Sequence, residues 1–239
     1  MFRTVDQAAS ERFYRTVLGA IGIEPDHESE ALVQWDDFSI AIAREQRPPT
    51  RHAHVGFVAP SRDHVDAFWR AGVDAGYADD GPPGVRAQYS PEYYGGFLLD
   101  PDGNSVEAVH HDDTRRGGHI DHLWIRVRDL DATAAFYSVI ARHAGLRPGL
   151  TWDRGRQFRG GWSTFSLIDD GRPLTENLHI AFPAPDRQTV QDFHAAAIAA
   201  GYQSNGEPGE RPQYHPGYYA AFVFDPDGAN IESVYHGRP

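Results

Sequence analysis

The chain has no cysteine among its 239 residues. This absence excludes disulfide bonds, zinc–thiolate sites, iron–sulfur clusters and thiol nucleophiles, so any metal site must use His, Asp or Glu side chains. Lysine is absent as well, because all 22 basic residues are Arg. Schiff-base chemistry and covalent attachment of pyridoxal phosphate are therefore also excluded.

Positive charge and long apolar runs are scarce too. The 22 basic residues face 34 acidic ones, which gives a formal net charge of −12. Binding to a nucleic-acid backbone needs clustered cations, so we expect no nucleic-acid partner. No apolar run approaches the roughly 18 to 20 residues of a membrane span, and the first ten residues lack the apolar core of a signal peptide. The sequence predicts a soluble, cytoplasmic protein without a membrane partner.

An internal repeat dominates the sequence. Residues 54–111 align with residues 179–236 without a gap at an offset of 125, and 28 of the 58 positions are identical. The match is plainest between QYSPEYYGGFLLDPDGNSVEAVHH and QYHPGYYAAFVFDPDGANIESVYH. A duplication with so long a period indicates two tandem domains rather than a solenoid. We predict domains over residues 1–113 and 114–239, with the polar stretch 112–118 as the linker.

Strand and helix patterns alternate within each half. In the second half, residues 119–127 alternate with period two, and a helix follows from Asp129 with Phe136 and Ile140 on one buried face. Short β-prone pieces follow around residues 157–158 and 163–168. The order then restarts with a strand over 178–182, a helix from 186, and strands over 218–224 and 230–235. The predicted inward positions of that helix are Val190, Phe193 and Ile198. Each half therefore reads as two βαβββ modules, which makes an α+β fold.

Three features together resemble the vicinal oxygen chelate superfamily. They are the paired βαβββ modules, a first strand DHLWIRVRDL followed by a helix containing FY, and a last hairpin YYAAFVFDPDGANIE. This superfamily includes glyoxalases, extradiol dioxygenases, fosfomycin-resistance transferases and bleomycin-binding proteins, and the resemblance covers nearly the whole chain, twice. It implies two curved mixed-sheet domains built from paired modules. It also implies metal ligands on three strands, at positions that hold His122, His179 and Glu232.

The chemistry of this set suits a divalent metal ion. Two imidazoles and one carboxylate form the facial arrangement of iron(II) oxygenases, and the same set can hold Mn, Ni or Zn. Three protein ligands leave positions open for a substrate that binds through two adjacent oxygens. We therefore expect one divalent ion, Fe, Mn, Ni or Zn, in the C-terminal domain. The alternative for each ligand is an ordinary buried polar group that is merely hydrogen-bonded.

The first half lacks the corresponding third ligand. When Phe13 and Tyr14 are aligned with Phe136 and Tyr137, the partner of His122 falls before the first residue. The sequence therefore predicts a degenerate site in the N-terminal domain, where His54 and Glu107 either are relics of a lost site or pair with each other. A working second metal site there is the open alternative.

Further residues are candidates for catalysis and substrate binding. Tyr218, Tyr219 and His215 lie at the start of the last hairpin, and a Tyr or His near a metal can donate a proton or orient a bound oxygen. Strand alternation places at least one of the two tyrosines in the core. Trp124 and Arg126 share a strand face with His122, so Trp124 would wall the pocket and Arg126 would hold a substrate carboxylate.

Departures from individual families narrow the function. The absence of a further His between residues 151 and 177 disfavours standard catechol cleavage. The absence of Glu from GWSTFSLID disfavours glyoxalase I chemistry. The absence of an evident cation cluster disfavours fosfomycin transfer. The sequence predicts a metal-dependent dioxygenase or lyase/isomerase that acts on a small vicinal-oxygen substrate. The alternative is a metal-free protein that binds an aromatic antibiotic or metabolite, as bleomycin-binding members do. A monomer with paired domains and a homodimer that exchanges modules both stay open.

Overall fold

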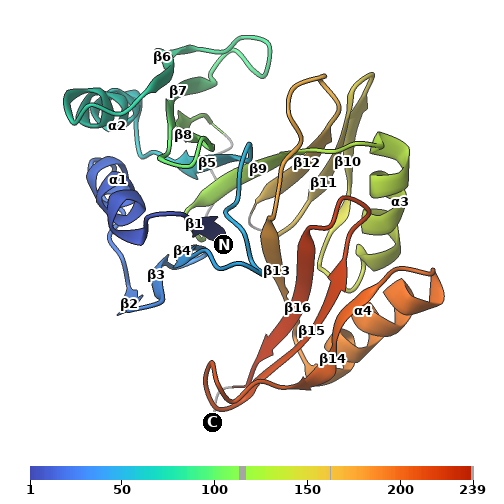
Figure 1. Ribbon diagram of the computed structural model, residues 1–239. Coiled ribbons are helices and arrows are strands. Elements are labelled where there is room, and N and C mark those ends of the chain that lie inside the picture. Colours follow the sequence, from blue (N-terminus) through green and yellow to red (C-terminus); the bar gives the residue numbers. More distant parts are fainter. Residues whose placement is uncertain (113–116, 162, 238–239) are drawn as a thin grey trace. The chain divides into compact units, whose positions relative to one another are not determined.

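The computed structural model describes residues 1–112, 117–161 and 163–237. Figure 1 traces four consecutive βαβββ modules from blue to red, as the periodicities predict. The first module comprises β1 (Phe2–Thr4), α1 (Gln7–Gly19), β2 (His27–Ser29), β3 (Leu32–Trp35) and β4 (Phe38–Ile42). The second comprises β5 (His54–Val58), α2 (Arg62–Asp74), β6 (Asp79–Val85), β7 (Tyr94–Leu99) and β8 (Ser105–His110).

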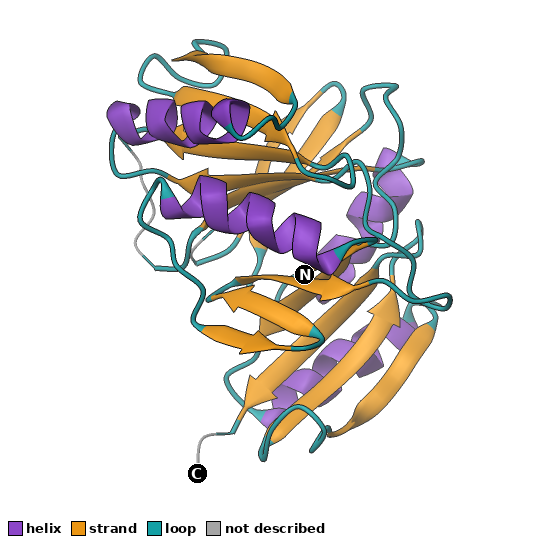
Figure 2. Ribbon diagram, turned by 60° about the vertical axis from the view of Figure 1, so that its left-hand side comes forward, coloured by secondary structure: helices purple, strands orange, loops and turns teal. Residues whose placement is uncertain are grey.

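The other two modules repeat this order. The third comprises β9 (Ile120–Arg126), α3 (Leu130–Ile140), β10 (Arg147–Trp152), β11 (Gly155–Arg159) and β12 (Thr164–Ile168). The fourth comprises β13 (His179–Pro183), α4 (Arg187–Ala199), β14 (Ser204–Glu210), β15 (Tyr218–Phe224) and β16 (Asn230–His236). Each helix lies along one face of the strands of its own module (Figure 2). No helix in the described ranges is long and apolar enough to cross a membrane.

The chain divides into two compact units. Unit 1 comprises Met1–Ile125 and Trp162–Thr164, and unit 2 comprises Arg126–Gly161 and Phe165–Pro239. The predicted boundary at residues 113 and 114 lies outside the described residues, as does most of the predicted linker. The two compact units divide near the end of β9. The reason is backbone pairing, because β9 runs antiparallel to β5 and pairs His122 with Gly56.

Strand alternation sets the core of unit 1. Its strands form a four-stranded sheet in the order β1-β4-β3-β2 and a second set in the order β9-β5-β8-β7-β6. On β5, Val55 and Phe57 are completely buried on one face, where Phe57 packs against Phe38 of β4. Alternation places His54 and Gly56 together on the opposite face.

Unit 2 contains β10-β11-β12 and a four-stranded sheet in the order β13-β16-β15-β14. Asp129 and Asp186 cap α3 and α4 by accepting a backbone N–H three residues on. Phe136 and Ile140 are buried on α3, as the sequence predicts.

One predicted inward position on α4 is wrong. Val190 and Phe193 are completely buried, but Ile198 is 40% exposed and Ala197 takes the inward place. At about 100° per residue, position 198 lies about 80° around the helix from position 190, whereas position 197 lies only about 20° away.

Candidate metal centre

Three ligand side chains converge in unit 1. The Nε2 atoms of His54 and His122 are 2.9 Å apart, and each lies 3.1 Å from Oε2 of Glu107. Among the described residues, His54, Glu107 and His122 form a group that could hold a metal ion, because their ligand atoms all lie within 4.8 Å of one another. The three atoms form a nearly equilateral triangle.

Strand register brings these residues together. Parallel pairing of β5 with β8 sets Glu107 opposite Gly56, and antiparallel pairing of β5 with β9 sets His122 opposite Gly56 on the other side. His54 lies two residues before Gly56 and therefore on the same face of β5. Gly56 is the centre of the arrangement, with one ligand on each neighbouring strand.

Two glycines make room for the ligands. A Cβ on Gly56 would lie 2.6 Å from Nδ1 and 2.8 Å from Nε2 of His122, which is closer than real Cβ atoms approach. A Cβ on Gly95 would likewise collide with Oε1 of Glu107. The imidazole of His122 and the carboxylate of Glu107 occupy space that only glycine leaves open.

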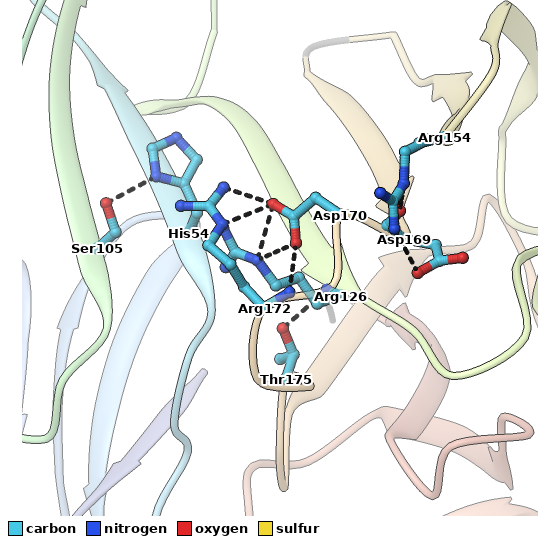
Figure 3. Close-up of polar contacts among 8 residues, drawn as sticks. All are labelled: His54, Ser105, Arg126, Arg154, Asp169, Asp170, Arg172 and Thr175. Atoms are coloured by element: carbon cyan, nitrogen blue, oxygen red, sulfur yellow. Dashed lines mark hydrogen bonds and ion pairs between the residues drawn. The ribbon is translucent and has the colours of Figure 1, made fainter.

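The remaining polar atoms of the ligands have partners of their own. Nδ1 of His54 lies 3.0 Å from the hydroxyl of Ser105 (Figure 3), and Nδ1 of His122 lies 2.9 Å from Oδ2 of Asp121. The Tyr93 hydroxyl donates to Oε1 of Glu107 at 2.9 Å. Outer partners of this kind fix the orientation of metal-binding His and carboxylate groups.

The cluster is buried and charged. His54, Glu107 and His122 are 9%, 1% and 5% exposed. Burial alone would lower the pKa of His122, but the adjacent Asp121 and Glu107 carboxylates outweigh it and raise that pKa to about 9. Burial alone would raise the pKa of Glu107, yet the two histidines hold it below its usual range. Without a metal, a protonated His122 therefore lies between two carboxylates.

The geometry also fits a divalent ion. Neighbouring ligands of an octahedral ion with bonds of about 2.1 Å are about 3.0 Å apart. The observed sides of 2.9, 3.1 and 3.1 Å match that spacing. Two imidazoles and one carboxylate suit Fe, Mn, Ni or Zn. Both Nε2 atoms face the same point, and Ser105 and Asp121 contact the two Nδ1 atoms on the other side of the rings.

Family comparison agrees with this fold. The family described as the Glyoxalase/Bleomycin resistance protein/Dioxygenase superfamily matches residues 1–108 and 119–233. The chain belongs to this superfamily. The resemblance that the sequence motifs indicate and the tandem βαβββ fold are thus confirmed. No curated protein matches the chain.

Solved structures share the architecture. Glyoxalase I from Zea mays superposes with a TM-score of 0.68 at 15% identity, over 98% of this chain and 90% of that chain, and a variant of the same enzyme gives 0.70. A glyoxalase/bleomycin resistance protein from Albidiferax ferrireducens T118 is 29% identical over 50% of this chain and 98% of its own, with a TM-score of 0.43. At 15% identity, the maize enzyme shows a common fold.

The predicted ligand set of this superfamily member is divided between its units. His122 lies in unit 1, whereas His179 and Glu232 lie in unit 2. In unit 1, His122 lies with His54 and Glu107. Pairing of β9 with β5 brings these side chains together. The predicted grouping of His122 with His179 and Glu232 stays a prediction.

His179 and Glu232 form a pair in unit 2. Nε2 of His179 lies 2.9 Å from Oε2 of Glu232, and the Tyr218 hydroxyl donates to Oε1 of Glu232 at 2.6 Å. Nδ1 of His179 lies 2.5 Å from Nδ2 of Asn230. This arrangement repeats the His54–Glu107–Tyr93 contacts of unit 1.

The other predicted site residues have varied surroundings. The ring of Trp124 lies 5.8 Å from that of His54 and 6.0 Å from that of His122, so it borders the cluster as a wall. Nε of Arg126 contacts both carboxylate oxygens of Asp170, at 3.1 and 3.2 Å, and Arg172 contacts the same carboxylate (Figure 3). The predicted role of Arg126 in holding a substrate carboxylate stays a prediction.

The predicted catalytic residues have different hydrogen-bond partners, although the rings of His215 and Tyr218 lie 5.2 Å apart. Tyr218 contacts Glu232, but Tyr219 lies beneath the Arg187 guanidinium and accepts a hydrogen bond from Gln191 on α4. Nε2 of His215 lies 3.0 Å from Nδ1 of His236. The sequence reasoning missed Tyr93, Asp121 and His111, although the offset of 125 carries Tyr93 to the predicted Tyr218 and could have found it.

Proposed function

We propose that this superfamily member is an enzyme that uses one divalent metal ion, held by His54, Glu107 and His122, to act on a small molecule with two adjacent oxygens. The observation that carries the proposal is the triangle of two imidazole nitrogens and one carboxylate oxygen at 2.9 to 3.1 Å. An ion bound by three protein ligands supplies Lewis-acid stabilisation of negative charge and keeps positions open for substrate. Oxygen-dependent cleavage or oxidation is the first choice of reaction, and lyase or isomerase chemistry is the second.

The surrounding residues support this role. Tyr93 directs its hydroxyl to Oε1 of Glu107, which fixes the carboxylate with Oε2 toward the histidines. Burial, and then the Glu107 charge, raise the pKa of Tyr93, so the phenol keeps its proton and remains a donor. The Trp124 ring lies 5.8 Å from the His54 ring and 6.0 Å from the His122 ring, and so borders both imidazoles.

The proposal assigns one ion to each chain. Unit 2 has Ala181 at the position of Gly56, opposite Glu232 in the same parallel register. A ring placed over Ala181 as His122 lies over Gly56 would collide with its Cβ. The His179–Glu232 pair therefore has no room for a second imidazole in this position.

The test is metal content per chain, measured by mass spectrometry on chelator-free protein that has been reconstituted with Fe, Mn, Ni or Zn. We expect one ion, which is lost in Glu107→Gln and retained in Glu232→Gln. The second variant is the matched control, because the repeat places the two carboxylates in equivalent positions. Loss in Glu232→Gln with retention in Glu107→Gln would move the site to unit 2.

A metal-free binding protein is the second candidate. The observation that favours it is a cluster that satisfies itself without metal, because a protonated His122 bonds to both Glu107 and Asp121. If this candidate is correct, chelator-treated protein binds an aromatic ligand as tightly as metal-treated protein. A ligand that binds only after metal addition supports the enzyme.

A further inference from the structure

His111 lies just after β8 and contacts two residues that hold the cluster from outside. Its Nε2 lies 3.1 Å from Oδ1 of Asp121. Its ring stacks on Tyr93 with centroids 5.7 Å apart and an interplanar angle of 4°. The His111 side chain is 16% exposed, so most of it is enclosed by protein.

These contacts close a circuit of five side chains. Asp121 uses Oδ1 for His111 and Oδ2 for Nδ1 of His122. The Tyr93 hydroxyl bonds to Oε1 of Glu107, whose Oε2 lies 3.1 Å from Nε2 of His122. His111 is thus connected to one ligand through a carboxylate and to another through an aromatic stack.

We propose that His111 is a positioning residue that fixes His122 through Asp121 and Glu107 through Tyr93. The proposal rests on the proposed function, since the atoms that it orients are the suggested metal ligands. A ligand that is free to rotate loses more entropy when it binds an ion, and losing such an outer partner typically weakens metal affinity about 10–100-fold. His111 does this without contacting the ligand atoms itself.

The repeat provides a matched control. The offset of 125 carries His111 to His236. In unit 2, Nδ1 of His236 lies 3.0 Å from Nε2 of His215, and the two rings stack with an interplanar angle of 21°. The same residue type at the equivalent position therefore has a different partner, and its removal does not disturb an aspartate–histidine chain.

Two variants separate the two contacts. His111→Phe keeps a ring against Tyr93 and loses the bond to Asp121, whereas His111→Ala loses both. We expect zinc dissociation constants, measured by chelator competition, to rise about 10-fold for His111→Phe and up to about 100-fold for His111→Ala. His236→Phe should leave the constant within about twofold of the parent value.

A second measurement does not depend on metal. In the ¹⁵N NMR spectrum of metal-free protein, we expect His122 to show one set of ring signals with a protected Nδ1 proton. His111→Ala should weaken that protection, and Asp121→Asn should abolish it. The positioning role would be overturned if the His111→Ala and Asp121→Asn proteins kept both the zinc affinity and the ring signals of the parent. A parent protein that binds no ion would overturn the proposed function alone, because the NMR comparison would still test His111.

Discussion

The two units carry the same three side chains at equivalent positions but differ in what faces them. In unit 1, His54 lies 3.1 Å from Glu107, and Tyr93 donates to that carboxylate at 2.9 Å. In unit 2, the distances from Glu232 to His179 and to Tyr218 are 2.9 and 2.6 Å. Among the described residues, a second histidine, His122, joins only the unit 1 group. Both units thus keep the His–Glu pair, and His122 joins that pair in unit 1.

Local register explains what both copies keep. The His and Glu of each pair lie on adjacent parallel strands of one module, β5 and β8 or β13 and β16. The third ligand comes from a strand of another module and also needs glycine beneath its ring. Unit 1 has Gly56 at that point, and unit 2 has Ala181.

The second nitrogen of each histidine differs as well. His54 faces the Ser105 hydroxyl, whose oxygen can accept a hydrogen bond from Nδ1–H. His179 faces Nδ2 of Asn230, whose Oδ1 already accepts a hydrogen bond from Asn205. An amide donor at Nδ1 leaves the proton of neutral His179 on Nε2, where it is donated to Glu232.

The largest effect is expected for Gly56→Ala, which gives unit 1 the alanine of unit 2. The new Cβ collides with the His122 ring, so the ring must move away from Glu107 and His54. We expect metal affinity to fall more than about 100-fold and unfolding stability to fall by about 1–3 kcal/mol from overpacking. Chelator competition and denaturant unfolding measure the two effects.

The reverse substitution is the control for that variant. Ala181→Gly opens the equivalent space in unit 2 without disturbing the cluster, so metal content should not change. A Gly56→Ala protein that keeps its ion at the parent's affinity would show that the His122 ring has another place from which to bind.

A second prediction concerns pH in the metal-free protein. The pKa of His122 is raised to about 9 in the folded state, against about 6.5 when unfolded. The resulting stabilisation is complete below about pH 6.5 and is lost as the pH rises through about 9, by an amount on the order of 3 kcal/mol. Urea unfolding at a series of pH values should show this fall in the parent protein and a much smaller one in His122→Gln. A slope that is equal in both proteins would contradict the charged His122.

Much of the fold could be predicted from sequence because periodicity and caps are local. The helices begin after Asp129 and Asp186 as expected, and β15 spans the predicted residues 218–224. The strands β6 and β14 escaped prediction because DDGPPGV and SNGEPGE carry no alternating apolar pattern. They are strands only through pairing with β7 and β15.

The types of residue in the proposed site could be predicted from the sequence, but their grouping in the structure could not. The sequence shows two histidines and a glutamate at suitable strand positions, and it singles out His122, His54 and Glu107 individually. Their grouping depends on which module pairs with β9, and no local pattern in residues 119–127 encodes that partner. Gly56 was the available signal, since a glycine at the centre of a buried strand often marks a close approach by another group.

The smallest effect is expected for substitution of the two equivalent tyrosines, Tyr93 in unit 1 and Tyr218 in unit 2. Tyr93→Phe removes the donor to Glu107 and should weaken metal binding about 10-fold, because an outer hydrogen bond to a ligand is lost. Tyr218→Phe removes the equivalent donor to Glu232 and should leave metal binding unchanged. Each variant should also lose about 1–3 kcal/mol of unfolding stability, because each loses a hydrogen bond to a charged acceptor. Chelator competition and urea unfolding on both variants separate the two effects. Equal losses of affinity would mean that both units bind metal, and the difference between Gly56 and Ala181 would then not decide which pair of ligands becomes a site.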